Sequence, residues 1–325
     1  MAYFAGVDLG ATNVRAAVAD GSGAVLGVAR RPTPQGPDGD AITETVLDLV
    51  REACRSASVH PTTLRAAGVG SIGPLNLAAG AVEDPANLPD AIDRIPLVDP
   101  IADLIDSDRV YLHNDATAGV MGERFFSHQH PDDMVYLTVS TGIGAGVAVD
   151  GHVLSGWDGN VGEVGHLVVD PEGRQRCGCG HRGHWEAYCS GDNIPGYARS
   201  LADRWDVVDT AVPLDDPAFD AADLFSHAPA DSFAARVVDR LTHWNAVGVT
   251  NLVHAYAPMV VYVGGAVALN NESLVVDPIR ERVPEMVMTN VPDIQVTTLG
   301  DDVVLRGAIA SALTGGTGDR SRLGR

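Results

Sequence analysis

Residues 3–13 read Tyr3-Phe4-Ala5-Gly6-Val7-Asp8-Leu9-Gly10-Ala11-Thr12-Asn13 and decide the fold class. An apolar run that includes one carboxylate is followed here by a turn of small and hydroxyl residues. Two more apolar runs follow at 14–19 and 24–30, separated by the small residues 21–23. This pattern predicts three strands joined by two turns.

The rest of the chain alternates helical and strand patterns. Apolar residues at helical spacing predict helices at 42–57, 101–105, 116–125, 231–256 and 303–313. Apolar runs predict strands at 64–72, 110–113, 134–139, 147–149 and 260–263. Residues 203–230 are rich in Asp and Pro, and we expect an exposed loop there. The alternation predicts an α/β fold.

A second glycine-rich loop lies between two predicted strands, at Ser140-Thr141-Gly142-Ile143-Gly144-Ala145-Gly146. It resembles the turn at 8–13, which suggests an internal duplication with a cleft between the halves. An apolar run rather than a helix follows the glycines, so the loop is not a dinucleotide-binding fingerprint. Either a plain hairpin or a phosphate loop fits, and the hydroxyls of Thr12 and Thr141 favour phosphate.

Composition excludes several mechanisms. The chain has 325 residues, a net charge of −21 and no lysine. It therefore lacks a P-loop lysine, a protein-kinase strand lysine and any lysine for a Schiff base. The negative charge also disfavours nucleic acid as a partner. We expect no membrane partner either, because no apolar run approaches ~20 residues.

The same composition indicates a setting. An acidic chain without lysine resembles proteins of haloarchaea, while an ordinary bacterial protein is the alternative. The first residues show no basic or apolar signal region, and the four cysteines suit a reducing compartment. We therefore expect a cytoplasmic protein.

Asn114 and Asp115 lie between a predicted strand and a predicted helix. Asp115 either caps the helix or serves as a general base at the carboxyl edge of a sheet, where ligands bind in open α/β folds.

The densest group of reactive side chains spans 162–186. His166, Cys177, Cys179 and His184 would form a closed Cys₂His₂ set, which is typical of structural zinc. The alternatives are unliganded thiols, or His181 in place of His184. Glu163 and Glu186 flank the group. They are either exposed side chains without a role or hydrogen-bond acceptors for a sugar diol.

Together these motifs resemble the ROK family of sugar kinases over nearly the whole chain. The resemblance rests on the ordered runs Thr141–Gly146, Gly162-Glu163-Val164-Gly165-His166, Cys177-Gly178-Cys179-Gly180 and Trp185-Glu186. It implies a two-domain actin/hexokinase-like (ribonuclease H-like) α/β fold. The expected smaller domain, 1–114 with 303–320, holds the first phosphate loop. The larger domain, 115–302, holds the second loop, the zinc site and the adenosine-side loop.

The resemblance also implies roles for single residues. Asp8, Gly10, Thr12 and Asn13 belong to the first phosphate loop, with Asp8 near Mg²⁺. Thr141 and Gly142 belong to the second, and Gly264 and Gly265 to the adenosine side. Asn114 and Asp115 match an Asn-Asp pair whose Asp is the base. The other sugar contacts would be Asn87, Glu163, His166 and Glu186.

Two positions depart from the family pattern. Ala11 stands where the first loop usually has a second glycine, and His184 replaces a third metal-binding cysteine. Cys₂His₂ is still a zinc set, so we expect the metal to remain.

We therefore expect ATP-dependent phosphorylation of glucose, with MgATP and structural zinc, in a homodimer or homotetramer. The alternatives are the same chemistry on fructose, mannose or an N-acetylhexosamine, or a non-catalytic sugar sensor. A ribokinase-type enzyme is disfavoured because its Gly-Ala-Gly-Asp signature is absent; Val147 follows the glycines here. A DNA-binding repressor is disfavoured by the negative charge. Repressors of the family have a DNA-binding domain before the first loop, and only seven residues precede Asp8 here.

The acidity predicts that salt stabilises the protein. Carboxylates crowded at this net charge repel one another unless cations screen them. The melting midpoint should therefore rise between about 0.1 and about 3 M KCl, over which the Debye length shortens to below about 3 Å. A midpoint that stays constant with salt would contradict the halophilic interpretation and leave the kinase interpretation intact.

Overall fold

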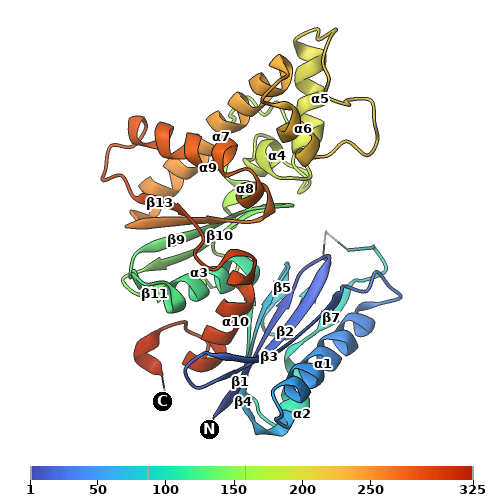
Figure 1. Cartoon of the computed structure of the whole chain (residues 1–325), viewed down its shortest axis with the longest axis vertical. Coiled ribbons are helices and arrows are strands. Elements are labelled where there is room, and N and C mark those ends of the chain that lie inside the picture. The colour runs from blue at the N-terminus through green and yellow to red at the C-terminus, as the bar shows by residue number, and fades with distance from the viewer. Residues whose placement is uncertain (1, 86–87, 158, 324–325) are drawn as a thin grey trace. The chain divides into compact units, whose positions relative to one another are not determined.

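The structure is a computed structural model that describes residues 2–85, 88–157 and 159–323. The chain divides into two compact units, and its course crosses between them several times. Unit 1 comprises 1–132, 146–161 and 298–325, and unit 2 comprises 133–145 and 162–297. Both units mix helices and strands, which confirms the predicted α/β class (Figure 1).

Most secondary structure of unit 1 comes from the first 132 residues. Its strands are β1 (Tyr3–Leu9), β2 (Asn13–Asp20), β3 (Val25–Pro32), β4 (Leu64–Ser71), β5 (Leu75–Asn76), β6 (Ala81–Glu83), β7 (Arg94–Pro96), β8 (Val110–Asn114) and β11 (His152–Val153). Its helices are α1 (Gly39–Ser56), α2 (Val98–Ile105), α3 (Asp115–Phe126) and α10 (Val303–Thr314).

Unit 2 is richer in helices. Its strands are β9 (Met134–Val139), β12 (Val260–Gly264) and β13 (Asp293–Val296), and β10 (Ile143–Val149) passes from unit 2 into unit 1. Its helices are α4 (Glu186–Cys189), α5 (Ile194–Arg204), α6 (Ala221–His227), α7 (Ser232–Tyr256), α8 (Ala266–Asn270) and α9 (Glu272–Arg282).

The two main sheets have the same strand order, as an internal duplication would give. The first is β3-β2-β1-β4-β8, and the second is β11-β10-β9-β12-β13. In the first, β1 pairs antiparallel with β2 and parallel with β4, and β4 is parallel to β8. In the second, β12 is parallel to both β9 and β13.

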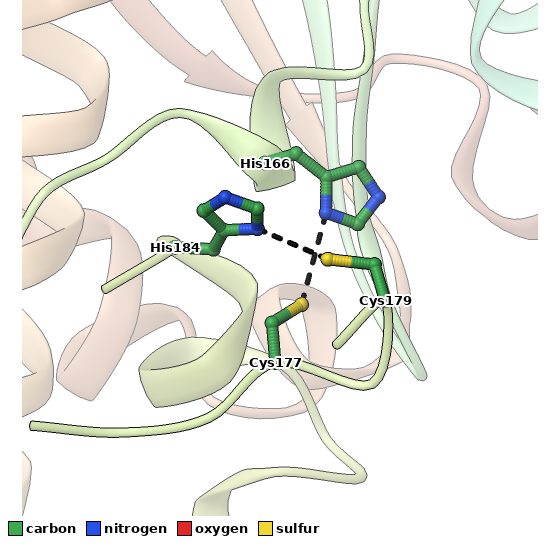
Figure 2. A group of neighbouring side chains, drawn as sticks. All are labelled: His166, Cys177, Cys179 and His184. Atoms are coloured by element: carbon green, nitrogen blue, oxygen red, sulfur yellow. Dashed lines mark hydrogen bonds between the residues drawn. The ribbon is translucent and has the colours of Figure 1, made fainter. Parts of the chain in front are cut away.

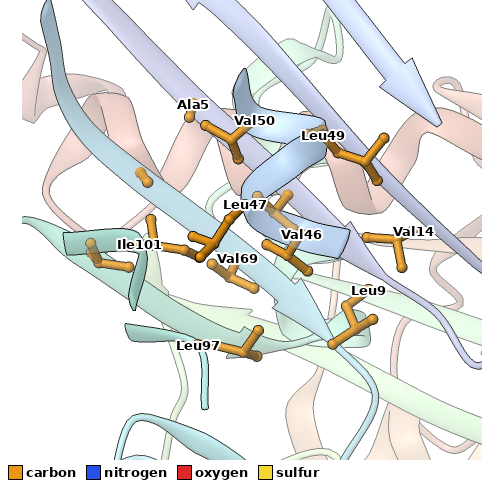
Figure 3. Close-up of a cluster of buried hydrophobic side chains, with 14 of the residues drawn as sticks. Ala5, Leu9, Val14, Val46, Leu47, Leu49, Val50, Val69, Leu97 and Ile101 are labelled. Atoms are coloured by element: carbon orange, nitrogen blue, oxygen red, sulfur yellow. The ribbon is translucent and has the colours of Figure 1, made fainter. Parts of the chain in front are cut away.

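One face of the first sheet is covered by α1 (Figure 3). The apolar stripe predicted for this helix is buried, with Ile42, Val46 and Leu49 fully enclosed. These side chains pack on Ala5, Val7 and Leu9 of β1, which alternate with residues of the other face. The helix begins after Asp38, whose carboxylate accepts a hydrogen bond from the Ala41 N–H at 3.1 Å.

The other face of the first sheet is covered by α10, which also crosses α3 at close range. A Cβ built on Gly307 would lie 1.6 Å from the Ala118 carbonyl oxygen, and one on Gly6 would lie 2.6 Å from Ile309. Glycines at these points let the backbones touch. Asp115 is the first residue of α3, so this contact fixes where the predicted base lies within unit 1.

In unit 2 a buried tryptophan fixes the start of α4. Trp185 is fully enclosed, and its Nε1 donates to Asn245 Oδ1 on α7 at 2.8 Å. Gly248 provides the space, since a Cβ there would lie 2.4 Å from the indole. Glu186 follows Trp185 directly, and its backbone is therefore tied to the longest helix of the unit.

The structure corrects two sequence-based expectations, concerning residues 203–230 and the second glycine run. Residues 203–230 are not only loop: they include α6, which begins with a capping box between Asp220 and Asp223. The second glycine run is a turn only at 140–142, and its remaining glycines lie in β10. Compact unit 1 includes α3, which packs on α10. The expected division into domains at 114 and 115 stays a prediction. In the part of the chain described, no helix is long and apolar enough to cross a bilayer.

The α3–α10 contact predicts a sharp difference between two glycines of unit 1. Gly307→Ala should lower the free energy of unfolding by about 1–3 kcal/mol or more, because the methyl group overlaps a backbone carbonyl. Gly21→Ala is the matched control, since nothing lies within 4 Å of a Cβ there. Urea unfolding measures both, and equal stabilities for the two variants would contradict the proposed contact.

Candidate active site

The predicted phosphate and base residues of unit 1 lie along one sheet edge. The parallel strands β1, β4 and β8 end together, with Leu9 paired to Ser71 and Ser71 paired to Asn114. The turn 10–12 leaves this edge from β1, and α3 leaves it from β8. The structure thus brings Asp8, Gly10, Thr12 and Asn13 to the same edge as Asn114 and Asp115. Their roles in binding and catalysis stay predictions.

Asn114 and Asp115 form the start of α3. The Asn114 side chain caps the helix by accepting the Ala116 N–H at 2.9 Å, and Asp115 Oδ1 accepts the same N–H at 2.7 Å. The helix N-terminus favours negative charge, which suits an ionised carboxylate. Behind them, burial lowers the pKa of His113 to about 4, and its Nε2 hydrogen-bonds to Ser311 Oγ at 2.7 Å. This histidine is therefore neutral at physiological pH.

The turn between β1 and β2 is held by two hydrogen bonds to the backbone of Gly10. Gly10 N–H donates to the Asn13 carbonyl at 2.9 Å, and Thr33 Oγ donates to the Gly10 carbonyl at 2.7 Å. Ala11 does not adopt positive φ, so the alanine found in place of glycine meets no backbone strain.

Arg15 is a residue of this site that sequence reasoning missed. Its Nε and Nη2 donate to Asp8 Oδ2 at 3.0 and 2.5 Å, and its Nη1 donates to Asp302 Oδ1 at 2.9 Å. Burial raises the pKa of the Asp8 carboxyl, and Arg15 opposes that rise. The contact with Asp8 could have been found from the hairpin, because the two residues are cross-strand partners.

The other predicted loops lie at the carboxyl edge of the second sheet, within unit 2. Ser140 N–H donates to the Gly142 carbonyl at 2.9 Å and closes the turn around Thr141. Gly264 ends β12 opposite Thr138 of β9. Gly265 has φ +88°, and a Cβ there would lie 2.5 Å from the Val139 carbonyl, so a side chain is excluded.

Four side chains of unit 2 converge as metal ligands would (Figure 2). One ligand atom from each of His166, Cys177, Cys179 and His184 lies within 4.8 Å of all the others. Nδ1 of His166 is 3.7 Å from Cys177 Sγ, and Nδ1 of His184 is 3.2 Å from Cys179 Sγ. Tetrahedral zinc with ordinary bond lengths requires sulfur–nitrogen separations of roughly 3.6 Å. The observed distances therefore fit zinc.

Local electrostatics at this cluster also suit a cation. Burial lowers the pKa of His184, with His166 and His181 adding to the effect, so its ring stays neutral as a ligand must. Burial raises the pKa of the Cys177 thiol to about 11, which a divalent cation would reverse. His181 stacks on His184 with ring centroids 5.7 Å apart and lies 3.7 Å from Cys179 Sγ, outside the closest set of four.

Two glutamates connect the cluster to the loops of unit 2. Glu186 Oε2 accepts the Ile143 N–H at 2.9 Å, beside the predicted second phosphate loop, and its Oε1 is 3.9 Å from Cys177 Sγ. Glu163 Oε2 is 3.8 Å from His166 Nε2, so the two ring nitrogens of His166 face different partners. Asn87, the remaining predicted sugar contact, lies outside the described residues.

Comparison with known proteins gives a consistent result. Residues 4–314 match the ROK family. A glucokinase from Pyrobaculum calidifontis is 36% identical over 96% of this chain and 95% of its own. Among solved structures, a ROK hexokinase from Thermus thermophilus has a TM-score of 0.78 at 31% identity, covering 95% of this chain and 97% of that one. A ROK family glucokinase from Streptomyces griseus, in complex with glucose and AMPPNP, has a TM-score of 0.75 at 28% identity, covering 95% and 99%. These likenesses confirm the predicted actin/hexokinase-like fold.

Proposed function

The chain belongs to the ROK family, and we propose that it transfers the γ-phosphoryl group of ATP to the 6-hydroxyl of glucose. It is an ATP-dependent hexose kinase, as full-length likeness to glucokinases and to a ROK hexokinase indicates. The observation that supports glucose most directly is the likeness to a glucokinase that binds glucose and AMPPNP, over 95% of this chain.

Asp115 is the general base of the proposed reaction. The sugar 6-oxygen bonds to the γ-phosphorus, the bond from that phosphorus to the bridging oxygen of ADP breaks, and Asp115 takes the hydroxyl proton. Its carboxylate accepts the Ala116 N–H and lies at the N-terminus of α3, where the helix dipole favours negative charge. Asn114 caps the helix and holds this orientation.

In this proposal the sugar is recognised by hydrogen bonds to five residues. These are Glu163, His166 and Glu186 in unit 2, together with Asn87 and Asn114. Carboxylates accept hydrogen bonds from a sugar diol, and the imidazole Nε2 of His166 supplies a further polar contact. Glu186 also holds the backbone of the second phosphate loop through the Ile143 N–H. One side chain would therefore link sugar binding to the position of that loop.

Nucleotide binding would use backbone amides in place of the absent lysine. Gly10, Thr12 and Asn13 would bind phosphate in the first turn, and Thr141 and Gly142 in the second. Gly264 and Gly265 would contact the adenosine. Within the described residues, Asp8 Oδ1 receives no hydrogen bond, and a carboxylate oxygen suits Mg²⁺. When bound, Mg²⁺ supplies charge neutralisation at the phosphates.

Zinc would have a structural role in this proposal. His166, Cys177, Cys179 and His184 would hold it as a closed set with no open position for a substrate. The two ends of this cluster are the segments that include Glu163 and Glu186. With zinc bound, the cluster would thus hold in place both glutamates that are predicted to bind the sugar.

Replacing the base should separate chemistry from binding. Asp115→Asn should lower kcat at least about 100-fold and leave glucose affinity nearly unchanged, because an amide keeps the shape but cannot take the proton. Asp103→Asn, exposed on α2, removes the same charge elsewhere and should behave as wild type. ADP release gives kcat, and calorimetry gives glucose affinity. A variant that retains more than about a tenth of kcat would show that Asp115 is not the base.

The zinc proposal is tested by metal content. Purified wild type should contain about one zinc per chain, His184→Ala should lose it, and His184→Cys should retain it. His181→Ala is the matched control and should keep the metal. Chelation should raise the KM for sugar and lower the melting temperature. Zinc that is lost in His181→Ala but kept in His184→Ala, or absent from wild type, would contradict the assignment.

A further inference from the structure

The Arg15 side chain joins three segments of unit 1. It contacts the Asp8 carboxylate on β1 through Nε and Nη2, as given above. It also contacts the residues before α10, through Nη1 to Asp302 Oδ1 at 2.9 Å and through Nη2 to the Asp301 carbonyl at 2.5 Å. The side chain is only 18% exposed, although Asp302 is largely open to solvent. Both ends of the guanidinium are therefore anchored.

The strand register explains this arrangement. Asp8 and Arg15 are direct partners in the antiparallel pair β1–β2, so their side chains leave the same face of the sheet. That face is the one covered by α10, because Gly6, two residues before Asp8, packs on Ile309. Arg15 is thus held between the first phosphate loop and the N-terminus of α10.

The contact with Asp8 is one-sided. Both donors from Arg15 reach Oδ2, and the part of unit 1 that the structure describes places no donor on Oδ1. A carboxylate held by one oxygen has a fixed plane, and its second oxygen points in a defined direction. Mg²⁺ needs near-ideal octahedral geometry, so the orientation of an oxygen ligand strongly affects its affinity.

We propose that Arg15 is a positioning residue for the metal–nucleotide complex: it fixes Asp8 by Oδ2 so that Oδ1 faces the Mg²⁺ of MgATP. The proposal rests on the proposed kinase function, which places Mg²⁺ near Asp8. The anchor at Asp301 and Asp302 prevents the guanidinium from turning toward the phosphates. Arg15 therefore acts through Asp8, and its effect requires the metal.

Two substitutions at Arg15 isolate this role. Arg15→Gln removes the charge. Arg15→Lys keeps the charge but cannot supply the planar fork that holds both Asp8 and Asp302. Arg31→Gln is the matched control, because Arg31 lies on β3 facing α1, where it pairs with Glu52 at 3.0 Å and contacts no residue of the site. Asp302→Asn weakens the outer anchor and leaves Asp8 untouched.

The experiment compares nucleotide binding with and without metal. Calorimetry measures the affinity of each purified full-length variant for AMPPNP in excess Mg²⁺ and in EDTA, and for glucose separately. Both Arg15 variants should bind Mg-AMPPNP about 10–100-fold more weakly, as for other residues that orient a metal ligand. Their affinities for metal-free AMPPNP and for glucose should stay within about twofold of wild type, and Arg31→Gln should match wild type throughout.

The outcomes separate the alternatives. Unchanged Mg-AMPPNP affinity in the Arg15 variants would overturn the proposal. So would an equal loss with and without Mg²⁺, which would indicate direct phosphate contact. Melting curves identify a variant that fails to fold; if Arg15→Gln does, Arg15→Lys and Asp302→Asn provide the comparison. If wild type phosphorylates no hexose, the proposed function fails, but the metal dependence of binding still tests Arg15.

Discussion

The close contact between α3 and α10 is the constraint on which the arrangement of unit 1 depends. Gly307 lets α10 touch the backbone of α3 at Ala118, and Glu123 on α3 accepts the Thr298 N–H at 2.7 Å, just before α10 begins. The N-terminus of α3 presents Asp115, and the residues before α10 anchor Arg15. One helix crossing therefore positions both Asp115, the predicted base, and the residues that hold Arg15 against Asp8 within the same unit.

Much of the fold and of the candidate site could be predicted from local sequence. Polar residues at the ends of predicted parallel strands indicate which edge of the sheet holds the site. Asp8 lies near the end of one apolar run, and Asn114 directly follows another. The Cys/His group spans only 19 positions, so its spacing alone was enough to predict a metal site. The contact between Arg15 and Asp302 joins residues 287 positions apart and left no local signal. Helix α6 was not predicted because Asp220, which caps it, lies in a segment whose Asp- and Pro-rich composition is typical of a loop.

Unit 2 shows how a buried anchor can support a polar site. Trp185 is held by Asn245 and Gly248, and the next residue, Glu186, accepts the Ile143 N–H beside the predicted second phosphate turn. The Cys/His cluster lies beside it, so a bound metal would tie the same segment a second time. The structure accommodates both departures from the family pattern. Ala11 needs no positive φ, and His184 Nδ1 lies 3.2 Å from Cys179 Sγ, close enough for both atoms to bind one metal ion.

The central claim is phosphorylation of glucose at its 6-hydroxyl by ATP, and phosphorus NMR of the product tests it most directly. The purified chain would be supplied with ATP, Mg²⁺ and an equimolar mixture of glucose, fructose, mannose and N-acetylmannosamine. The account predicts that glucose 6-phosphate forms first and in step with ADP. A different sugar phosphate as the main product, or inorganic phosphate in place of any sugar phosphate, would contradict it.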